Sequence, residues 1–120
     1  MNATIIHKTN VTNEVLDNLA MALPGIISDA LELPGGKLAI LKPEQVALEF
    51  SQASPRDTGS DIKIIVFARD LTLRSSNEKE LAKEILDKVV SLTTKPGDEY
   101  SLDVRLCLME IGAAEHPLRS

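Results

Sequence analysis

Residues 61–111 read DIKIIVFARDLTLRSSNEKELAKEILDKVVSLTTKPGDEYSLDVRLCLMEI, and this stretch decides the fold. Residues 61–69 are rich in β-branched side chains and have polar turn residues on both sides, which predicts a largely buried strand. Residues 77–92 then follow a helical period, with charged side chains on the face opposite an apolar one. The apolar face of this predicted helix carries Leu81, Ala82, Ile85, Val89 and Leu92.

From Ser101 the period returns to two, so one face of the last predicted strand is uniformly aliphatic. Such a face must be covered, and the helix just before it is the nearest cover. The sequence Ser75-Ser-Asn-Glu78 has the form of a capping box that would start this helix. Pro96 and Gly97 would end it, because proline cannot continue a helix and glycine accepts left-handed dihedral angles.

The first half of the chain has the same pattern of elements. Residues 3–8 predict a short strand, and residues 46–50 alternate as a second strand after a turn at residues 42–45. Residues 51–60, which contain proline and glycine, predict a solvated loop between the two halves.

Two predictions remain open for the helix of the first half. Residues 23–33 predict a helix with Pro24 comfortably in its first turn. A single longer helix over residues 13–33, kinked at Pro24, fits the same residues. The sequence alone does not separate these two predictions.

The chain therefore reads β-α-β, loop, β-α-β, which predicts an α/β (α+β) fold. We expect a duplicated β-α-β unit, with a four-stranded sheet that carries two helices on one face, in a single domain over residues 1–120. The other face would be too apolar to stay bare and too polar for a monomer core, so we expect burial against another subunit. On the last two strands it would carry Lys63, Ile65, Phe67, Arg69, Asp103, Arg105, Cys107 and Met109.

Composition narrows the classes of function. The chain is 43% hydrophobic and 26% charged, as in an ordinary globular protein, and its net charge of −5 disfavours binding to nucleic acid or to an anionic membrane. It contains no apolar run of membrane-spanning length and no signal-peptide pattern, so a cytoplasmic protein is expected. Cys107 is the one cysteine, which excludes an internal disulfide, and the two histidines lack metal-ligand spacing.

Three short motifs carry a resemblance to a known family. Leu23-Pro-Gly-Ile-Ile27 looks like the opening of the first helix in the carboxymethyl-hydroxymuconate isomerase branch of the tautomerase superfamily. Lys42-Pro-Glu-Gln45 is similar to the Lys-Pro turn before the second strand in the macrophage migration inhibitory factor branch. Arg74-Ser75 and residues 82–86 resemble the lead-in and second helix of the isomerase branch. The layout thus resembles the tautomerase superfamily over nearly the whole chain, which implies a homotrimer with helices outside and sheets inside.

The resemblance also implies a site. In that family the base is an N-terminal proline, whose amine moves a proton alpha to a carbonyl while cationic side chains hold the substrate carboxylate. Asn2 stands in the place of the proline, so the catalytic amine would belong to Asn2, or to Met1 if that residue is retained. Lys42 and Arg74 correspond to the substrate-binding cations. His7 is expected to be a hydrogen-bonded structural residue near the amine.

The function implied is that of a tautomerase or isomerase-like protein that acts on or binds a small keto or enol carboxylate, without a metal or other cofactor. Its activity would be weak or altered because the proline is absent. One alternative is a trimeric homologue that binds the ligand without catalysis. Another is a ferredoxin-like regulatory module, whose sheet would be antiparallel with the first and third strands central, whereas two parallel β-α-β pairs favour the tautomerase arrangement.

Overall fold

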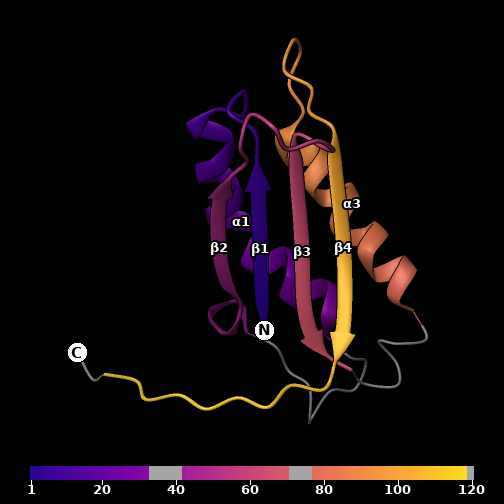
Figure 1. Cartoon of the computed structure of the whole chain (residues 1–120). Helices are drawn as coiled ribbons and strands as arrows, with labels where there is room; N and C mark the ends of the chain where they lie inside the picture. Colours follow the sequence, from indigo (N-terminus) through magenta and orange to yellow (C-terminus); the bar gives the residue numbers. More distant parts are fainter. Residues whose placement is uncertain (33–41, 71–76, 119–120) are drawn as a thin grey trace.

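A computed structural model describes residues 1–32, 42–70 and 77–118 of the chain. The four strands form one sheet, and the two helices lie together on one side of it (Figure 1). The predicted four-stranded α+β fold with both helices on one face is therefore confirmed. In chain order the elements are β1 (Asn2–His7), α1 (Asn13–Leu31), the short 3-10 helix η1 (Pro43–Gln45), β2 (Ala47–Gln52), β3 (Ile62–Arg69), α3 (Glu78–Thr93) and β4 (Leu102–Met109).

The sheet has the strand order β2-β1-β3-β4. β1 is parallel to β2 and β3 is parallel to β4, whereas the two central strands β1 and β3 are antiparallel. One helix lies between the strands of each parallel pair in the sequence, so the β-α-β unit occurs twice. The ferredoxin-like alternative is wrong, because it requires outer strands that are antiparallel to their neighbours.

Side chains alternate between the two faces of the sheet. On β3 the even-numbered residues from Ile62 to Ala68 are fully buried beneath the helices, and the odd-numbered ones are not. The face turned away from the helices is called the open face below, and its predicted residues on β3 and β4 are confirmed. The open face carries Asn2, Thr4 and Ile6 on β1, Ala47, Glu49 and Ser51 on β2, Lys63, Ile65, Phe67 and Arg69 on β3, and Asp103, Arg105, Cys107 and Met109 on β4.

α1 is the longer of the two helices that the sequence allowed. It begins after Thr12, whose hydroxyl accepts a hydrogen bond from the Val15 amide at 3.3 Å. Pro24 removes a helical donor, at a cost of about 3 kcal/mol. An apolar stripe at every fourth position offsets this cost, because each fully buried side chain contributes about 1.5–3 kcal/mol. The stripe consists of Val15, Leu19, Leu23, Ile27 and Leu31, all of them buried.

At three places the predicted boundaries differ from the structure by more than one residue. α1 ends at Leu31, and the predicted end at residue 33 lies outside the described residues. β2 extends through Gln52, because the pairing with β1 continues to its last residue, and this shortens the predicted loop to residues 53–60. α3 begins at Glu78 with Asn77 in the N-cap position, so the predicted capping box does not start the helix where expected. Its serines at 75 and 76 also lie outside the described residues.

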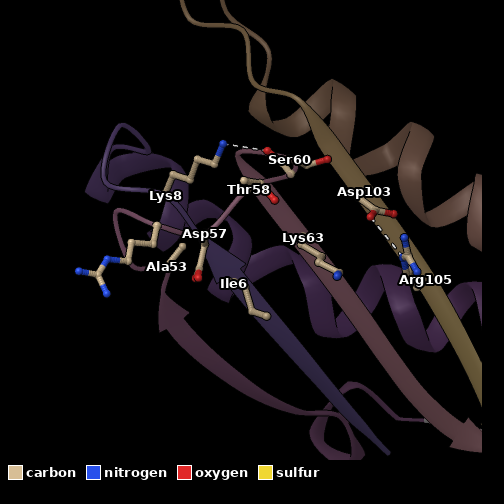
Figure 2. A pocket seen from close by; sticks show the side chains of 11 residues that line it. Ile6, Lys8, Ala53, Asp57, Thr58, Ser60, Lys63, Asp103 and Arg105 are labelled. Atoms are coloured by element: carbon tan, nitrogen blue, oxygen red, sulfur yellow. Dashed lines mark hydrogen bonds and ion pairs between the residues drawn. The ribbon is translucent and has the colours of Figure 1, made fainter.

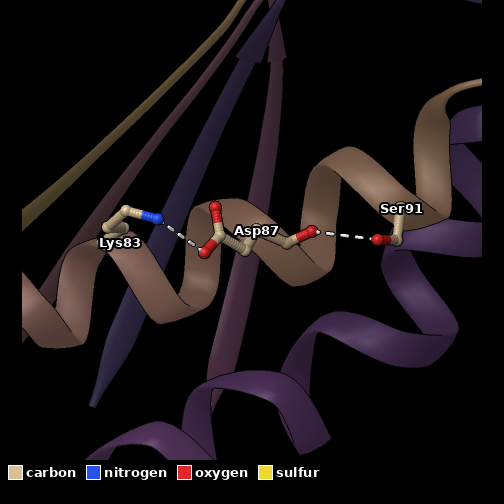
Figure 3. A network of polar contacts seen from close by, with 3 residues as sticks. All are labelled: Lys83, Asp87 and Ser91. Atoms are coloured by element: carbon tan, nitrogen blue, oxygen red, sulfur yellow. Dashed lines mark hydrogen bonds and ion pairs between the residues drawn. The ribbon is translucent and has the colours of Figure 1, made fainter.

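α3 has two chemically different faces. Ile85 and Val89 are fully buried against the sheet, and the buried Thr93 hydroxyl donates to the Val89 carbonyl at 2.9 Å. On the solvent side, Lys83 pairs with Asp87 at a distance of 2.9 Å, and the two side chains point toward each other (Figure 3). Both of these side chains are largely exposed, so the pair contributes only a few tenths of a kcal/mol.

The turn after α3 matches its sequence signature. Residues 95–98 close a tight turn in which the Asp98 amide donates to the Lys95 carbonyl at 2.9 Å. Gly97 has a φ of 87°, which only glycine adopts without strain. The Lys95 ammonium also pairs with the Glu14 carboxylate, which links this turn to the first turn of α1. The predicted stop at Pro96 and Gly97 is therefore confirmed.

No helix in the described part of the chain is long and apolar enough to cross a membrane.

Candidate functional site

The start of β1 lies at one end of the open face. Asn2 pairs with Ala47 of β2 and with Phe67 of β3, and Phe67 pairs in turn with Cys107 of β4. Asn2 is exposed, whereas the Met1 side chain is partly buried against the core and the Met1 carbonyl accepts the Ala47 amide at 3.0 Å. Met1 therefore already takes part in the sheet, and Ala47, Phe67 and Cys107 lie in line with Asn2 across the open face.

Lys42 leads into β2 through η1. Its amide donates to the Gln45 side-chain oxygen at 3.0 Å, and its carbonyl accepts the Gln45 amide at 2.9 Å, which fixes the backbone of this turn. The Lys42 side chain is exposed. Because β1 and β2 run in parallel and start in register, the structure brings Lys42 and Asn2 to the same end of the sheet.

Arg74 lies outside the described residues, so its position relative to Asn2 stays a prediction. β3, which precedes it in the chain, is antiparallel to β1 and ends at Arg69, beyond the Phe67 that pairs with Asn2. The strand before Arg74 therefore ends at the same end of the sheet where β1 begins.

His7 is in a different place from the one predicted. It ends β1, so the length of the strand separates it from Asn2. Its Nδ1 atom lies 3.3 Å from the Lys8 carbonyl oxygen, in agreement with a hydrogen-bonded structural histidine. The prediction that it lies near the N-terminal amine is wrong, because an extended strand of six residues carries its two ends to opposite ends of the sheet.

A hollow of about 520 Å³ opens at the other end of the open face, where β1 ends and β3 and β4 begin (Figure 2). The loop 53–60 forms its rim, and Ile6 and Ala53 give it an apolar part. Sequence analysis placed some of these residues on the open face but did not connect them, because the loop contributes six of the eleven lining residues. The charged lining residues are Lys8, Arg56, Asp57, Lys63, Asp103 and Arg105.

Contacts in the hollow engage some of these charges. The Lys8 ammonium donates to the Gly59 carbonyl at 2.8 Å, and the Arg105 Nε atom pairs with Asp103 at 3.3 Å. Lys63 is half-buried between the two neighbouring strands and has no ion pair or side-chain hydrogen bond to any residue that the structure describes.

Asp61 and Ser101 are hydrogen-bonded to each other at the starts of β3 and β4, next to the hollow. The Asp61 amide donates to the Ser101 hydroxyl at 2.8 Å, and the Ser101 amide donates to the Asp61 carboxylate at 3.0 Å. The hydrogen bond from the Ser101 backbone holds the pKa of the Asp61 carboxyl below its ordinary value of 3.8. These two reciprocal hydrogen bonds position β4 beside β3, and with it the open-face residues Asp103 and Arg105.

Over residues 1–32, 42–70 and 77–118, no three His, Cys, Asp or Glu side chains are grouped in a way that could hold a metal ion. The chemistry that the two ends of the open face offer is therefore that of amines, guanidinium groups and carboxylates. An amine can accept a proton from a carbon acid, and nearby cations can hold a carboxylate or an enolate.

Comparisons with known proteins show which solved structures share this fold. No protein-family model matches the sequence, and neither does any curated protein. Solved structures do match. An F6 fused 4-OT protein in an asymmetric trimer has a TM-score of 0.65 and 14% identity, over 94% of this chain and 92% of its own.

Two further structures agree. Malonate semialdehyde decarboxylase has a TM-score of 0.58 and 14% identity, over 96% of this chain and 93% of its own. N1, a member of the cis-3-chloroacrylic acid dehalogenase family, has a TM-score of 0.63 and 13% identity, over 91% of this chain and 75% of its own. Likeness at such identity concerns the arrangement of the backbone. The chain therefore has the fold of the tautomerase superfamily.

Proposed function

We propose that this protein binds a small keto or enol carboxylate at the end of the open face where β1 begins, and isomerises it slowly through its N-terminal amine. The observation that carries the proposal is the convergence of three segments at that end. These segments are the start of β1 with Asn2, the lead-in to β2 with Lys42, and the end of β3 before the segment that contains Arg74.

The roles follow from the chemistry of each group. The amine of Asn2, or of Met1 if that residue is retained, takes a proton alpha to the substrate carbonyl and returns it to another atom. Lys42 supports the developing enolate as an exposed point charge, and Arg74 holds the substrate carboxylate through its planar guanidinium group. Phe67, which is paired with Asn2 on the open face, supplies an apolar surface for the carbon skeleton.

Slow turnover is part of the proposal. A primary amine on Asn2 lacks the rigid ring of a proline, so it has more freedom to point away from the substrate. If Met1 is retained, its amine lies about 3.3 Å farther along the strand, since this is the rise per residue in a strand. Either arrangement places the base less firmly than a terminal proline does.

We also propose a homotrimer in which the open faces of three copies face inward. The open face combines half-buried apolar side chains, such as Ile65 and Phe67, with charged ones such as Arg69. A sheet face of this mixed kind is typical of a surface covered by other copies. The fused 4-OT structure with the same fold is itself a trimer.

A non-catalytic binding protein is the second candidate. It is favoured by the pairing of the Met1 carbonyl with Ala47, which keeps Met1 in the sheet, and by the asparagine that follows it. In this case Lys42 and Arg74 would hold the carboxylate, and no proton would be transferred.

The test measures ketonisation of enol phenylpyruvate by ultraviolet absorbance, with intact mass spectrometry to identify the terminal residue. We expect slow turnover by the natural chain, faster turnover by Asn2→Pro when Met1 is removed, and a raised KM for Lys42→Gln. Lys79→Gln, on the exposed side of α3, is the matched control and should leave KM unchanged.

The outcomes separate the candidates. Ligand-induced thermal stabilisation without turnover, in both the natural chain and Asn2→Pro, would favour the binding protein. If neither stabilisation nor turnover is observed, both candidates are refuted. Sedimentation tests the trimer separately, since a particle at 13.0 kDa rather than three times that mass would refute the assembly.

A further inference from the structure

The hollow on the open face occupies a position equivalent to that of the N-terminal site. The sheet consists of two parallel pairs that meet at the antiparallel strands β1 and β3. An antiparallel pair has a local two-fold axis between its strands. The start of β3 therefore has the same position in the second half of the chain as the start of β1 has in the first half. Asn2 is the first residue of β1 on the open face, and Lys63 is the first residue of β3 on the same face.

The lining of the hollow is locally basic, although the chain as a whole is acidic. Four cations and two carboxylates surround the hollow, whereas the full chain carries a net charge of −5. A cation surplus inside a concave surface concentrates the field and attracts anions. The four cations are Lys8, Arg56, Lys63 and Arg105.

Lys63 is the available cation at the centre of this arrangement. Figure 2 shows it between Ile6 of β1 and Asp103 of β4, with which it is paired in register. The Asp103 carboxylate lies toward Arg105 instead, at 3.3 Å from its Nε atom. The Lys63 ammonium therefore keeps its three donors free within the described chain, on a side chain that the sheet already holds half-buried.

The remaining lining suits a small organic anion. Thr58 and Ser60 add hydroxyl groups at the rim, while Ile6 and Ala53 offer a short apolar surface. A volume of about 520 Å³ is in the range of small-ligand sites. Lysine and arginine bind carboxylate and phosphate groups through the same charge-assisted hydrogen bonds.

We propose that the hollow is a second ligand site, which binds a small organic anion through a carboxylate or phosphate group held by Lys63 and Arg105. It is the counterpart, in the second half of the chain, of the site at the start of β1. It contains no N-terminal amine, so it binds its ligand without isomerising it. Its existence does not depend on the activity proposed for the first site.

The experiment titrates the full-length protein with sodium phosphate and, separately, with sodium succinate, and records amide chemical shifts by NMR at a fixed ionic strength set with sodium chloride. We expect saturable shifts confined to residues 57–63 and 103–105. Lys63→Gln should weaken the affinity about fivefold or more, and Lys63→Arg should largely restore it. Asp103→Asn should strengthen binding, because it removes a competing carboxylate.

Lys79→Gln is the matched control, since it removes an equal charge from an exposed position on α3. Saturation by phosphate alone or by succinate alone would support the site and identify the group that it recognises. Shifts scattered over the surface, or equal weakening by Lys63→Gln and Lys79→Gln, would mean nonspecific attraction and would overturn the proposal. The absence of saturable shifts with both anions would overturn it as well.

Discussion

Replacement of Asp61 should destabilise the protein in a way that depends on pH. Asp61→Ala removes the acceptor of the Ser101 amide, a hydrogen bond of 3.0 Å at the paired starts of β3 and β4. A hydrogen bond to a charged acceptor contributes about 1.5–3 kcal/mol when it is shielded from water. Because Asp61 is partly exposed, we expect a loss of about 1–1.5 kcal/mol at neutral pH. For a chain of this length that loss corresponds to a melting point lower by about 4–6 °C.

The pH dependence follows from the direction of the pKa shift. The Ser101 amide lowers the pKa of Asp61 in the folded state below its ordinary value of 3.8. The contribution of the carboxylate to stability is therefore fully present above pH 3.8 and is lost as the pH falls through the folded-state pKa. The difference in stability between the natural chain and Asp61→Ala should shrink over that acidic range.

Urea denaturation at neutral pH and at several pH values below 3.8 measures this difference, with the protein concentration held constant because assembly also affects stability. Glu99→Ala is the control, since Glu99 is exposed, close in sequence to Ser101, and has no hydrogen bond or ion pair to a described residue. An equal loss for both variants, or a loss for Asp61→Ala that is the same at every pH, would refute the reasoning.

Three further predictions concern the two helices and the turn that follows α3. Ile85→Ala should cost about 3–4 kcal/mol in urea denaturation because Ile85 is fully buried, whereas Val90→Ala, at a position 40% exposed on the same helix, should cost much less. Gly97→Ala should lower the melting point, at a cost of about 1 kcal/mol, because alanine is strained at a φ of 87°. Lys95→Gln should lower the melting point only slightly, and this loss should vanish in high salt because the pair with Glu14 is exposed.

The second half of the chain was predictable because its periods are unambiguous. The alternation that begins at Ile62 and the helical spacing of Ile85 and Val89 both correspond to buried positions in the structure. The turn at Gly97 was predictable for the same kind of reason, because a proline followed by a glycine has few other conformations.

The first half was less predictable. Pro24 divides α1 in the sequence, and local propensity alone cannot weigh one lost hydrogen bond against the burial of Val15 and Leu19 on the sheet. The four-residue spacing from Val15 to Leu19 and from Leu19 to Leu23 is the signal that favours the long helix.

The candidate site was predictable only where it follows the direction of the strands. Two parallel strands that start together bring Asn2 and Lys42 to one end of the sheet, and this could be inferred from the order of elements. The hollow depends on contacts between residues far apart in the chain, such as Lys8 with Gly59, about which periodicity carries no information.

The exposed loop of residues 53–60 is the covalent connection between the two halves of the chain. The halves are also in noncovalent contact, because β1 pairs with β3 and α1 packs beside α3. A nick in this loop, for instance after Arg56, should therefore leave two fragments that remain associated as a heterodimer. If each fragment is produced separately, complementation should rebuild the sheet when the two are mixed. Each half could then be labelled or altered chemically on its own before reassembly.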